Sequence, residues 1–370
     1  MMIKDLWDRV NRWITKEMPV GKVRLFTLVL LAVTAAAAGL YWGLTSWYQP
    51  LDAPLALATS TASAVPDTAA PGEQATPTPE EGGTPTIQPV CGGPPSMTIL
   101  VSGVASEKYL YGLADAVRVV RVDFQNQQVS ALALPRDLWV EIPSIGDHGI
   151  SQGKLNQAYF YGTEGMGYYD GGGAGSGLLA ETLQTNYGLR ADHYLAVNLN
   201  SFEMIIDAMG GIDVYLPQDV YRKQFGEPEL YLKAGSHHLN GKQAEMLARQ
   251  RIEIGDFGRI NNQTIILKAV AAKLLTPSGM GSLPNLVNRL RDNVLTDLSP
   301  SQVSQLLCLA GKIDPGADIQ FESLPQEFLE EGLVYDPARG ENTYALEGDR
   351  EAISRLLSAF QAGEWPESGE

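Results

Sequence analysis

A stretch of twenty residues without a charged side chain, 25–44, sets the first constraint on this chain. It reads LFTLVLLAVTAAAAGLYWGL, which is long enough to cross the hydrocarbon core of a bilayer as one helix. Tyr41, Trp42, Trp47 and Tyr48 lie at or just beyond its far end, where aromatic side chains favour the membrane interface. The sequence therefore predicts one transmembrane helix.

The charges that flank this stretch predict its orientation. Residues 1–24 carry a net charge of +3, although the whole chain of 370 residues carries -16. Positively charged flanks stay in the cytoplasm. We therefore expect a single-pass protein of the cell membrane, with residues 1–24 as a cytoplasmic tail and the main domain extracellular. A cleaved signal peptide with its site at Ala36-Ala37-Ala38 is the alternative, and the long charged lead argues against it.

The composition divides the rest of the chain. Residues 45–95 are rich in Pro, Thr, Ala and Gly and have few large apolar side chains, so they cannot build a core and are expected to form an extracellular linker. Residues 96–363 have a globular composition and form the expected domain, followed by a tail at 364–370. The excess of Asp and Glu over Lys and Arg argues against a nucleic-acid-binding surface.

Predicted strands and helices alternate within the domain. Two strands joined by a turn at Asn126 should form an antiparallel pair. The pattern predicts a single layered α/β domain with a central mixed β-sheet flanked by helices. The expected strands are 97–102, 116–123, 129–134, 138–142, 193–199, 212–216 and 318–324, and the expected helices are 178–187, 202–209 with a cap at Ser201, 239–246, 260–275, 283–294, 301–310 and 349–360.

Two local features leave alternatives open. Cys91 and Cys308 are the only cysteines, and outside the cytoplasm they are free to form a disulfide, although two unpaired thiols fit the sequence equally well. The segment 162–177 is rich in glycine but does not end in Gly-Lys-Ser/Thr, so it is not a phosphate-binding P-loop. We expect it to be a mobile loop, and a lid is one role for it.

A local cluster of positive charge stands out in this acidic chain. Asp256, Arg259 and Gln263 are spaced to share one face of a helix, and Asp256 is expected to cap its start. Arg249 and Arg251 point the same way only on an extended chain, so the preceding helix should end before them. Guanidinium groups bind phosphate oxygens, and several together suit a pyrophosphate. A solvated helix end with ordinary ion pairs is the alternative.

Three more residues are candidates for the same chemistry. Arg136 follows a predicted strand, and strand ends in layered α/β sheets commonly face a ligand. Lys154 is a further candidate phosphate contact. Asp115 opens a predicted strand and could ligate Mg²⁺, which takes one or two carboxylates together with substrate phosphates. Taken alone, each of these residues is more often structural than functional.

Six blocks in this order resemble the LytR-CpsA-Psr family of bacterial cell-envelope phosphotransferases. The likeness runs from about residue 97 to 275 and continues more weakly to about 360. The matching blocks are Leu132-Ala133-Leu134-Pro135-Arg136-Asp137 with Val140-Glu141-Ile142-Pro143, Lys154-Leu155-Asn156-Gln157-Ala158-Tyr159, Asp207-Ala208-Met209-Gly210-Gly211-Ile212-Asp213-Val214, Leu239-Asn240-Gly241-Lys242-Gln243-Ala244, Arg249-Gln250-Arg251, and Asp256-Phe257-Gly258-Arg259 with Gln263.

The resemblance implies an extracellular enzyme on a single membrane helix. Such proteins move a glycopolymer from a polyprenyl-pyrophosphate carrier to a cell-wall acceptor such as peptidoglycan, and a hydrophobic tunnel holds the lipid tail. By this resemblance Asp115 is a Mg²⁺ ligand and Asp256 is the aspartate that precedes the final arginine. The head-group contacts that it implies are Arg136, Lys154, Arg249, Arg251, Arg259 and Gln263.

The chain departs from the family pattern in the part that holds the metal. The family usually has Gly-x-Asp-x-Arg after the first strand, but here the aligned residues end in Ala105, Ser106 and Glu107. Leu113 stands where the family has an arginine, and Asn262 replaces another. Two hypotheses therefore remain: an active glycopolymer phosphotransferase, or a non-catalytic polyprenyl-phosphate-binding scaffold or regulator of the envelope.

Overall fold

The structure is a computed structural model, and it describes residues 47, 49–57, 88–222, 229–252, 254–276, 279, 281 and 293–365. Among these residues no helix has the length and the apolar character needed to cross a bilayer. The predicted cytoplasmic tail, 1–24, and the predicted transmembrane helix, 25–44, lie outside the described residues.

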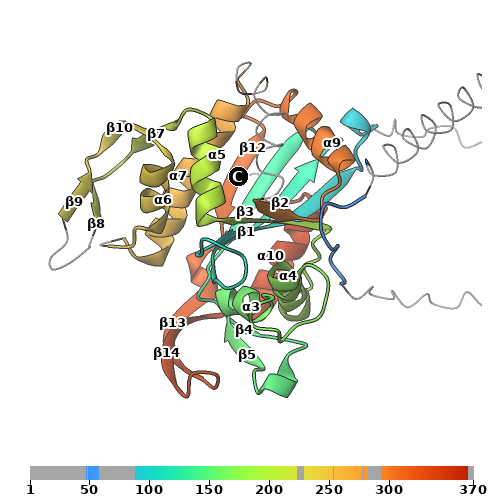
Figure 1. Ribbon diagram of the computed structural model, residues 1–370, viewed down its shortest axis with the longest axis vertical. Helices are drawn as coiled ribbons and strands as arrows, with labels where there is room; N and C mark the ends of the chain where they lie inside the picture. Colours follow the sequence, from blue (N-terminus) through green and yellow to red (C-terminus); the bar gives the residue numbers. More distant parts are fainter. Residues whose placement is uncertain are drawn as a thin grey trace, which may run out of the picture. The chain divides into compact units, whose positions relative to one another are not determined.

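A mixed six-stranded sheet forms the centre of the domain (Figure 1). Its order is β11-β6-β1-β2-β3-β12, with β6–β1 and β3–β12 parallel and the other neighbours antiparallel. The strands are β1 (Ser96–Val104), β2 (Ala114–Asp123), β3 (Gln128–Leu134), β6 (His193–Asn198), β11 (Val294–Thr296) and β12 (Ile319–Ser323). The central strands are rich in valine, leucine and alanine because both faces of the sheet are covered.

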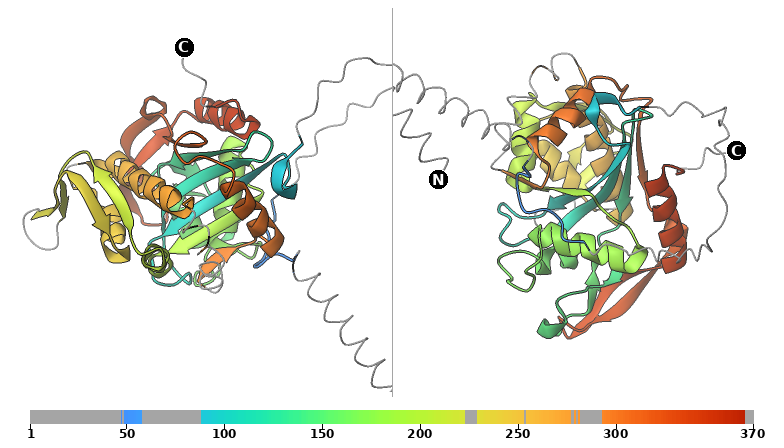
Figure 2. Two further views of the ribbon diagram at one scale, coloured as in Figure 1. Left: turned by 90° about the horizontal axis from the view of Figure 1, so that it is seen from above. Right: turned by 90° about the vertical axis from the view of Figure 1, so that its right-hand side faces the viewer.

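One face of the sheet packs against α3 (Leu155–Tyr161), α4 (Ala174–Tyr187) and α10 (Arg350–Ala362). Alternate residues of β2, including Val117 and Val119, point into this largest core, as the two-residue period of a strand requires. Tyr159 and Phe360 are among its largest fully buried side chains. Figure 2 shows these helices on one side of the sheet and α7 and α9 on the other.

The opposite face carries two smaller cores. One lies under α9 (Pro300–Ala310) and contains Ile99, Val122 and Leu309. The other is built by α5 (Leu199–Ala208), α6 (Gly241–Arg249) and α7 (Gly255–Leu274) together with two ladders beyond the central sheet. Those ladders pair β7 (Ile212–Leu216) with β10 (Gly235–Leu239), and β8 (Val220–Arg222) with β9 (Glu229–Leu232).

Two further strand pairs lie beside α3. β4 (Trp139–Glu141) pairs with β5 (Gln152–Lys154), and β13 (Leu329–Asp336) pairs with β14 (Glu341–Gly348). The second pair is a long hairpin that reaches away from the sheet in Figure 1. Its base is fixed by the amide of Leu346, which donates to the carbonyl oxygen of Asp137 at 2.9 Å. Short 3-10 turns occur at Val90–Gly92, Gly146–His148 and Gln326–Phe328.

The predicted elements agree with the observed ones in the central sheet and in most helices, and the expected mixed sheet flanked by helices is confirmed. The helix predicted at 202–209 is α5, but its cap is Asn198, whose side chain accepts from the amide of Ser201. The helix predicted at 283–294 falls largely outside the described residues, and β11 begins at Val294. Strands β5, β8, β9, β10, β13 and β14 and helix α3 were not predicted.

A disulfide and a short segment connect the residues before β1 to the rest of the domain. Cys91 is bonded to Cys308 on α9, across 217 residues of sequence, which settles the alternative that the sequence leaves open. Residues 50–57 fall within the stretch expected to be a linker, yet Leu55 packs against the main core. The hydroxyl of Tyr194 also donates to the carbonyl oxygen of Ala53 at 3.2 Å.

The glycine-rich segment is packed rather than open at its second half. Residues 174–177 form the first turn of α4, and Gly175 and Gly177 are buried there. A Cβ atom on Gly177 would lie 2.0 Å from the carbonyl oxygen of Gly172, and one on Gly172 would lie 2.1 Å from that of Pro54. Glycine is therefore needed here for close backbone approach.

We expect Gly177→Ala to lower the free energy of unfolding by about 2 kcal/mol, because the added methyl group overlaps a backbone oxygen that cannot move freely. Chemical denaturation measures this loss. Gly146→Ala is the matched control, since its Cβ meets open space. Equal effects of the two substitutions would contradict the packing described for the start of α4.

Replacing both Cys91 and Cys308 by serine should lower the free energy of unfolding by about 3 kcal/mol, because the bond closes a long loop in the unfolded chain. Thermal unfolding with and without a reductant measures the effect. The reduced wild-type protein should unfold like the double variant, and a variant as stable as the oxidised protein would argue against the bond.

Candidate functional site

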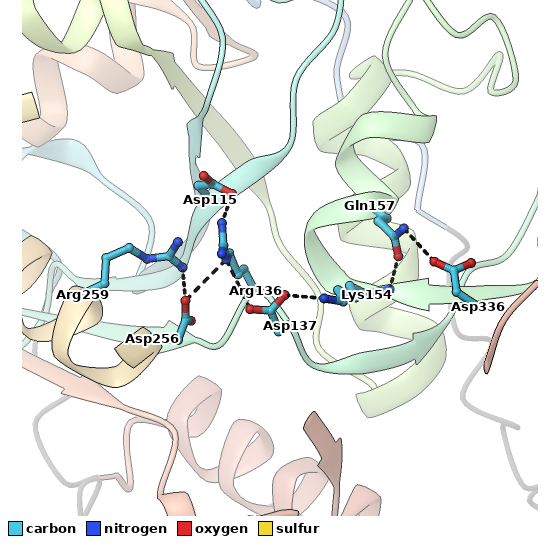
Figure 3. Close-up of polar contacts among 8 residues, drawn as sticks. All are labelled: Asp115, Arg136, Asp137, Lys154, Gln157, Asp256, Arg259 and Asp336. Atoms are coloured by element: carbon cyan, nitrogen blue, oxygen red, sulfur yellow. Dashed lines mark hydrogen bonds and ion pairs between the residues drawn. The ribbon is translucent and has the colours of Figure 1, made fainter. Parts of the chain in front are cut away.

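Charged side chains from four separate segments form one continuous network at an end of the central sheet (Figure 3). Arg136 is its centre. Its Nη1 lies 2.5 Å from Asp115 Oδ1, and its Nε lies 3.4 Å from both Asp137 Oδ2 and Asp256 Oδ1. The network continues through Arg259 Nη2, 2.8 Å from Asp256 Oδ1, and through Lys154 Nζ, 3.0 Å from Asp137 Oδ1.

The strands place the first half of this network. β2 starts, and β1 and β3 end, at the same edge of the sheet, because β2 is antiparallel to both. This brings Asp115, the second residue of β2, beside Arg136, which follows β3 after Pro135. A bulge in the β1–β2 register lies next to Asp115, between Gly103 and Val104. Bulges of this kind redirect side chains near functional sites.

Two helix starts place the second half. The first amides of α3, at Leu155 and Asn156, donate to the carbonyl oxygens of Leu138 and Arg136 at 2.8 and 3.0 Å. These bonds satisfy helix donors that would otherwise lack partners, and they hold Lys154 beside Arg136. α7 begins at Gly255, whose φ of 63° is a backbone conformation that glycine adopts readily.

The first turn of α7 supplies Asp256 and Arg259. Asp256 was expected to cap this helix, but the cap residue is Ile254 and no side chain accepts a capping hydrogen bond. Asp256 lies inside the first turn and pairs with Arg259 three residues later. The correction has a simple cause: the carboxylate satisfies two arginines instead of the helix amides.

The network is largely removed from water. The side chains of Arg259, Asp137, Arg136 and Asp256 are 3, 9, 10 and 12% exposed, and that of Asp115 is 27% exposed. Burial alone would lower the pKa of Arg136, but the attraction of Asp115, Asp137 and Asp256 raises it above its ordinary value. Arg136 is therefore charged at any physiological pH.

Burial shifts the pKa values of Asp256 and Arg259. Burial raises the pKa of the Asp256 carboxyl despite the opposing attraction of Arg259 and Arg136. Burial, followed by repulsion from Arg136, lowers the pKa of Arg259. Both shifts disfavour the charged forms, so for each group the cost of burial outweighs the attraction between the two.

Several polar atoms in the pair lack hydrogen-bond partners among the described residues. They are Arg259 Nε and both carboxylate oxygens of Asp256, whose contact with Arg259 is an ion pair without good hydrogen-bond geometry. A buried donor without an acceptor is costly. An anionic oxygen placed here would give Arg259 the acceptor that the protein does not supply.

The other predicted arginines are less closely joined to the network. Arg251 is exposed, but its charge acts on both Asp256 and Arg259, which places it nearby. Arg249 is the last residue of α6 and pairs with Glu245 at 2.5 Å. The prediction that this helix ends before Arg249 is therefore wrong.

Gln263 also lies outside the network. Its Nε2 donates to the carbonyl oxygen of Ala248 at 3.3 Å, so in this arrangement it joins α7 to the end of α6. The helical spacing predicted Gln263 on the same face as Arg259. In the structure its side chain instead donates a hydrogen bond to a backbone carbonyl oxygen near the end of α6. Of the eight predicted site residues, five are directly connected: Asp115, Arg136, Lys154, Asp256 and Arg259.

Three residues that extend the network were not among the predicted site residues. Asp137 joins Arg136 to Lys154. Gln157 accepts from the amide of Lys154 at 2.6 Å and donates to Asp336 Oδ2 at 3.2 Å. Asp336 comes from the β13–β14 hairpin, 179 residues further along the chain, so no local pattern could have revealed it.

The donor set does not fit a resident metal ion. Asp115, the predicted Mg²⁺ ligand, already pairs with Arg136, and Ala105 offers no side-chain oxygen. Across the described ranges no three His, Cys, Asp or Glu side chains are grouped so that they could hold a metal. Mg²⁺ requires several oxygen ligands, so oxygens from a bound phosphate would have to complete any site that Asp115 begins.

A hollow of about 390 Å³ lies elsewhere, on β7 and β10. It is lined by Asp213, Val214, Tyr215, Ser236, His237 and His238. None of these residues belongs to the charged network. In the hollow Asp213 Oδ1 lies 2.7 Å from His238 Nδ1.

We expect Arg259→Leu to lower the free energy of unfolding by about 3 kcal/mol at neutral pH, because it leaves Asp256 buried beside one arginine fewer. Losing that attraction raises the Asp256 pKa further, so the folded state binds this proton more tightly. The contribution of Asp256 to stability then falls as pH rises through the interval between its unfolded and folded pKa values.

Denaturation at about pH 4 and about pH 7 measures this dependence. The loss relative to wild type should be smaller at the acidic pH, where Asp256 is protonated. Arg339→Leu is the control, since Arg339 forms an exposed pair with Glu341, which contributes about 1 kcal/mol or less. A loss that does not change with pH would contradict the electrostatic account of the pair.

Several known proteins are similar to this chain in sequence. The chain is 30% identical over 212 residues to the regulatory protein MsrR of Staphylococcus aureus (strain COL), a match that covers 56% of this chain and 58% of MsrR. It is 31% identical over 191 residues to the polyisoprenyl-teichoic acid–peptidoglycan teichoic acid transferase TagV of Bacillus subtilis (strain 168), covering 50% of this chain and 45% of TagV. The chain thus spans about half the length of the curated relatives it matches.

A solved structure is similar to this chain in fold. The crystal structure of B. subtilis TagV superposes with a TM-score of 0.55 at 26% identity, and the match covers 72% of this chain and 97% of that one. The model of the LytR_cpsA_psr family matches residues 73–359. This range includes the sheet, the flanking helices and the whole charged network. The chain therefore belongs to the LytR_cpsA_psr family.

Proposed function

We propose that this protein is a membrane-anchored extracellular phosphotransferase that moves a glycopolymer from a polyprenyl-pyrophosphate carrier to a cell-wall acceptor such as peptidoglycan. The observation that carries the proposal is the buried network around Arg136 and Arg259, in which Arg259 Nε has no acceptor among the described residues. Family membership supports it, since TagV is named as a teichoic acid transferase.

The network suits a diphosphate because its cations are already in place. Arg136 and Arg259 are held 3.4 and 2.8 Å from the same carboxylate oxygen of Asp256, so both guanidinium groups are oriented before a phosphate arrives and competes with Asp256 for them. Preorganised charge of this kind stabilises a phosphoryl-transfer transition state. Lys154 adds a third cation on the Asp137 side. The amides at the start of α7 add a partial positive charge.

The reaction itself needs one displacement at phosphorus. An acceptor hydroxyl attacks the phosphate that carries the glycopolymer, a new P–O bond forms, and the bond to the polyprenyl phosphate breaks. The hydroxyl proton passes to solvent or to a nearby base, and polyprenyl phosphate leaves with the bonding electrons. In this scheme Arg136 and Arg259 contact the phosphate oxygens, whereas Asp256 positions both arginines.

The lipid would approach beside Asp115. The loop before β2 exposes three large apolar side chains close to that residue in sequence: Leu110 and Tyr111 are 50% exposed and Leu113 is 36% exposed. Apolar side chains grouped on a surface favour a lipid or another apolar partner. This loop gives the polyprenyl tail an apolar surface next to the charged network, and the hydrophobic tunnel implied by the family remains part of the proposal.

Mg²⁺ enters this proposal only together with the diphosphate. Asp115 and the phosphate oxygens would supply its ligands, which is the usual way in which Mg²⁺ is held between a protein and a phosphate. The ion would add positive charge at the reacting phosphorus. Binding of the diphosphate should therefore strengthen with Mg²⁺, whereas Mg²⁺ alone should not bind.

A non-catalytic scaffold or regulator is the second candidate. It is favoured by Ala105 and Leu113, which replace an acidic and a basic residue of the family pattern, and the relative MsrR is named as a regulatory protein. Such a protein would bind the polyprenyl diphosphate through the same network and release it unchanged. Binding alone does not separate the two candidates, so turnover must be measured as well.

We expect Arg136→Ala to weaken binding of farnesyl pyrophosphate to the full-length protein in detergent by about tenfold or more, because it removes charge-assisted hydrogen bonds to phosphate. Calorimetry with and without Mg²⁺ measures the affinity. Arg355→Ala is the control, since Arg355 is exposed on α10 and lies 4.0 Å from Glu351. Equal affinity of both variants would remove both candidate functions.

Turnover then separates the enzyme from the binder. A polyprenyl-pyrophosphate-linked glycan and purified peptidoglycan are incubated with wild-type protein, and the phosphodiester product is measured by mass spectrometry. The enzyme should form product, and Arg136→Ala should form at least about a hundredfold less. Tight binding without product would favour the scaffold.

A further inference from the structure

The β13–β14 hairpin is joined to the charged network by hydrogen bonds at two points. At its base, the amide of Leu346 donates to the carbonyl oxygen of Asp137 at 2.9 Å. At the far end of β13, Asp336 accepts from Gln157, which in turn accepts from the amide of Lys154. The contact between Gln157 and Asp336 is drawn in Figure 3. The hairpin is therefore held beside Asp137 and Lys154 along its length.

Tyr344 on β14 is the side chain that meets the network. Lys154 Nζ lies 5.9 Å from the centre of its ring, within reach of a cation–π attraction. Burial, and then the charges of Glu331 and Asp137, raise the pKa of Tyr344 to about 12. Its hydroxyl therefore stays protonated at neutral pH and is hydrogen-bonded to Glu331.

One face of the hairpin continues outward from Tyr344. Leu333 is directly opposite Tyr344 in the β13–β14 register, and Tyr335 is opposite Asn342. Residues two apart on a strand share a face, so these four side chains form one surface. Leu333 is 75% exposed, Tyr335 is 59% exposed and Tyr344 is 41% exposed. We call these four residues the hairpin platform.

Its exposure calls for an explanation. Large apolar side chains grouped on a surface and bordered by polar groups mark a ligand or partner site more often than chance. The main core already has tyrosine and leucine side chains that are fully buried, so the platform residues are not needed to complete it. Nothing described in the structure covers them.

We propose that the hairpin platform binds the sugar ring that is joined to the pyrophosphate held by the network. This inference rests on the proposed function and assigns the part of the substrate beyond the phosphates. A pyranose ring has an apolar C–H face that packs on a tyrosine ring, and its hydroxyl groups can bond with Asn342 and the Tyr344 hydroxyl. A phosphate at Lys154 brings the attached sugar to Tyr344.

The position favours a sugar over the lipid tail. The apolar loop at Leu110, Tyr111 and Leu113 precedes β2 on the Asp115 side of Arg136, whereas the platform is fastened on the Asp137 and Lys154 side. A pyrophosphate between them has two ends, one for each surface. The tail then uses the loop and the sugar uses the platform.

The test compares two probes that differ by one sugar: farnesyl pyrophosphate, and farnesyl pyrophosphate carrying N-acetylglucosamine on its outer phosphate. Calorimetry on the full-length protein should show the sugar strengthening wild-type binding by about tenfold, the scale of one good aromatic contact. Leu333→Ser should abolish this gain and leave the affinity for farnesyl pyrophosphate unchanged, and Tyr344→Ala should abolish the gain as well.

Two matched variants sharpen the result. Tyr344→Phe keeps the ring and should retain most of the gain, whereas a purely structural role of the hydroxyl would show as a loss of stability in both Tyr344 variants. Tyr215→Ala is the control, because Tyr215 is 68% exposed on β7 and outside the network.

The outcomes separate this inference from the proposed function. If wild-type protein binds neither probe, the proposed function is wrong. If it binds both probes equally, or if Tyr344→Ala keeps the gain from the sugar, the network holds a diphosphate but the platform does not bind the sugar. Pairing of two copies through the hairpin, detected by light scattering and lost in Leu333→Ser, would also overturn the inference.

Discussion

The position of Arg136 between three carboxylates is the interaction on which the site depends. Asp115, Asp137 and Asp256 come from β2, from the turn after β3 and from α7, and each lies within 3.4 Å of one guanidinium group. A buried cation has to find anions, because burial without them is very costly. The same contacts that satisfy Arg136 therefore join three parts of the fold at one edge of the sheet.

This arrangement has an excess of unused hydrogen-bonding capacity. Arg259 keeps an unpartnered Nε within the described part of the chain, and neither oxygen of Asp256 accepts a well-formed hydrogen bond. A protein built only for stability would replace such a pair with apolar side chains at little cost. A ligand with anionic oxygens would supply the acceptor that Arg259 Nε lacks, which is a functional reason to retain the pair.

The strands of the central sheet and most helices could be predicted from the sequence, for a physical reason. Valine-rich and leucine-rich runs such as those of β1 and β2 can be satisfied only inside a covered sheet, so their period and turns locate them. The strands β8, β9, β13 and β14 were not predicted, because their residues are partly exposed and their sequences lack a regular pattern of apolar residues. Likewise the prediction for Arg249 was wrong because α6 continues to this residue, where Arg249 pairs with Glu245 on the same helix.

By itself the sequence determined the family, through the resemblance of six blocks. Local composition and spacing also determined the alternation of strands and helices and the residue types suited to a diphosphate. Only the tertiary structure decided which of them meet: Arg136, Lys154 and Arg259 join one network, whereas Gln263 turns to the end of α6. It also decided that Cys91 and Cys308 are bonded and that Asp336 and Tyr344 reach the site. Contacts across such distances in sequence depend on how the strands and helices pack, which local patterns do not encode.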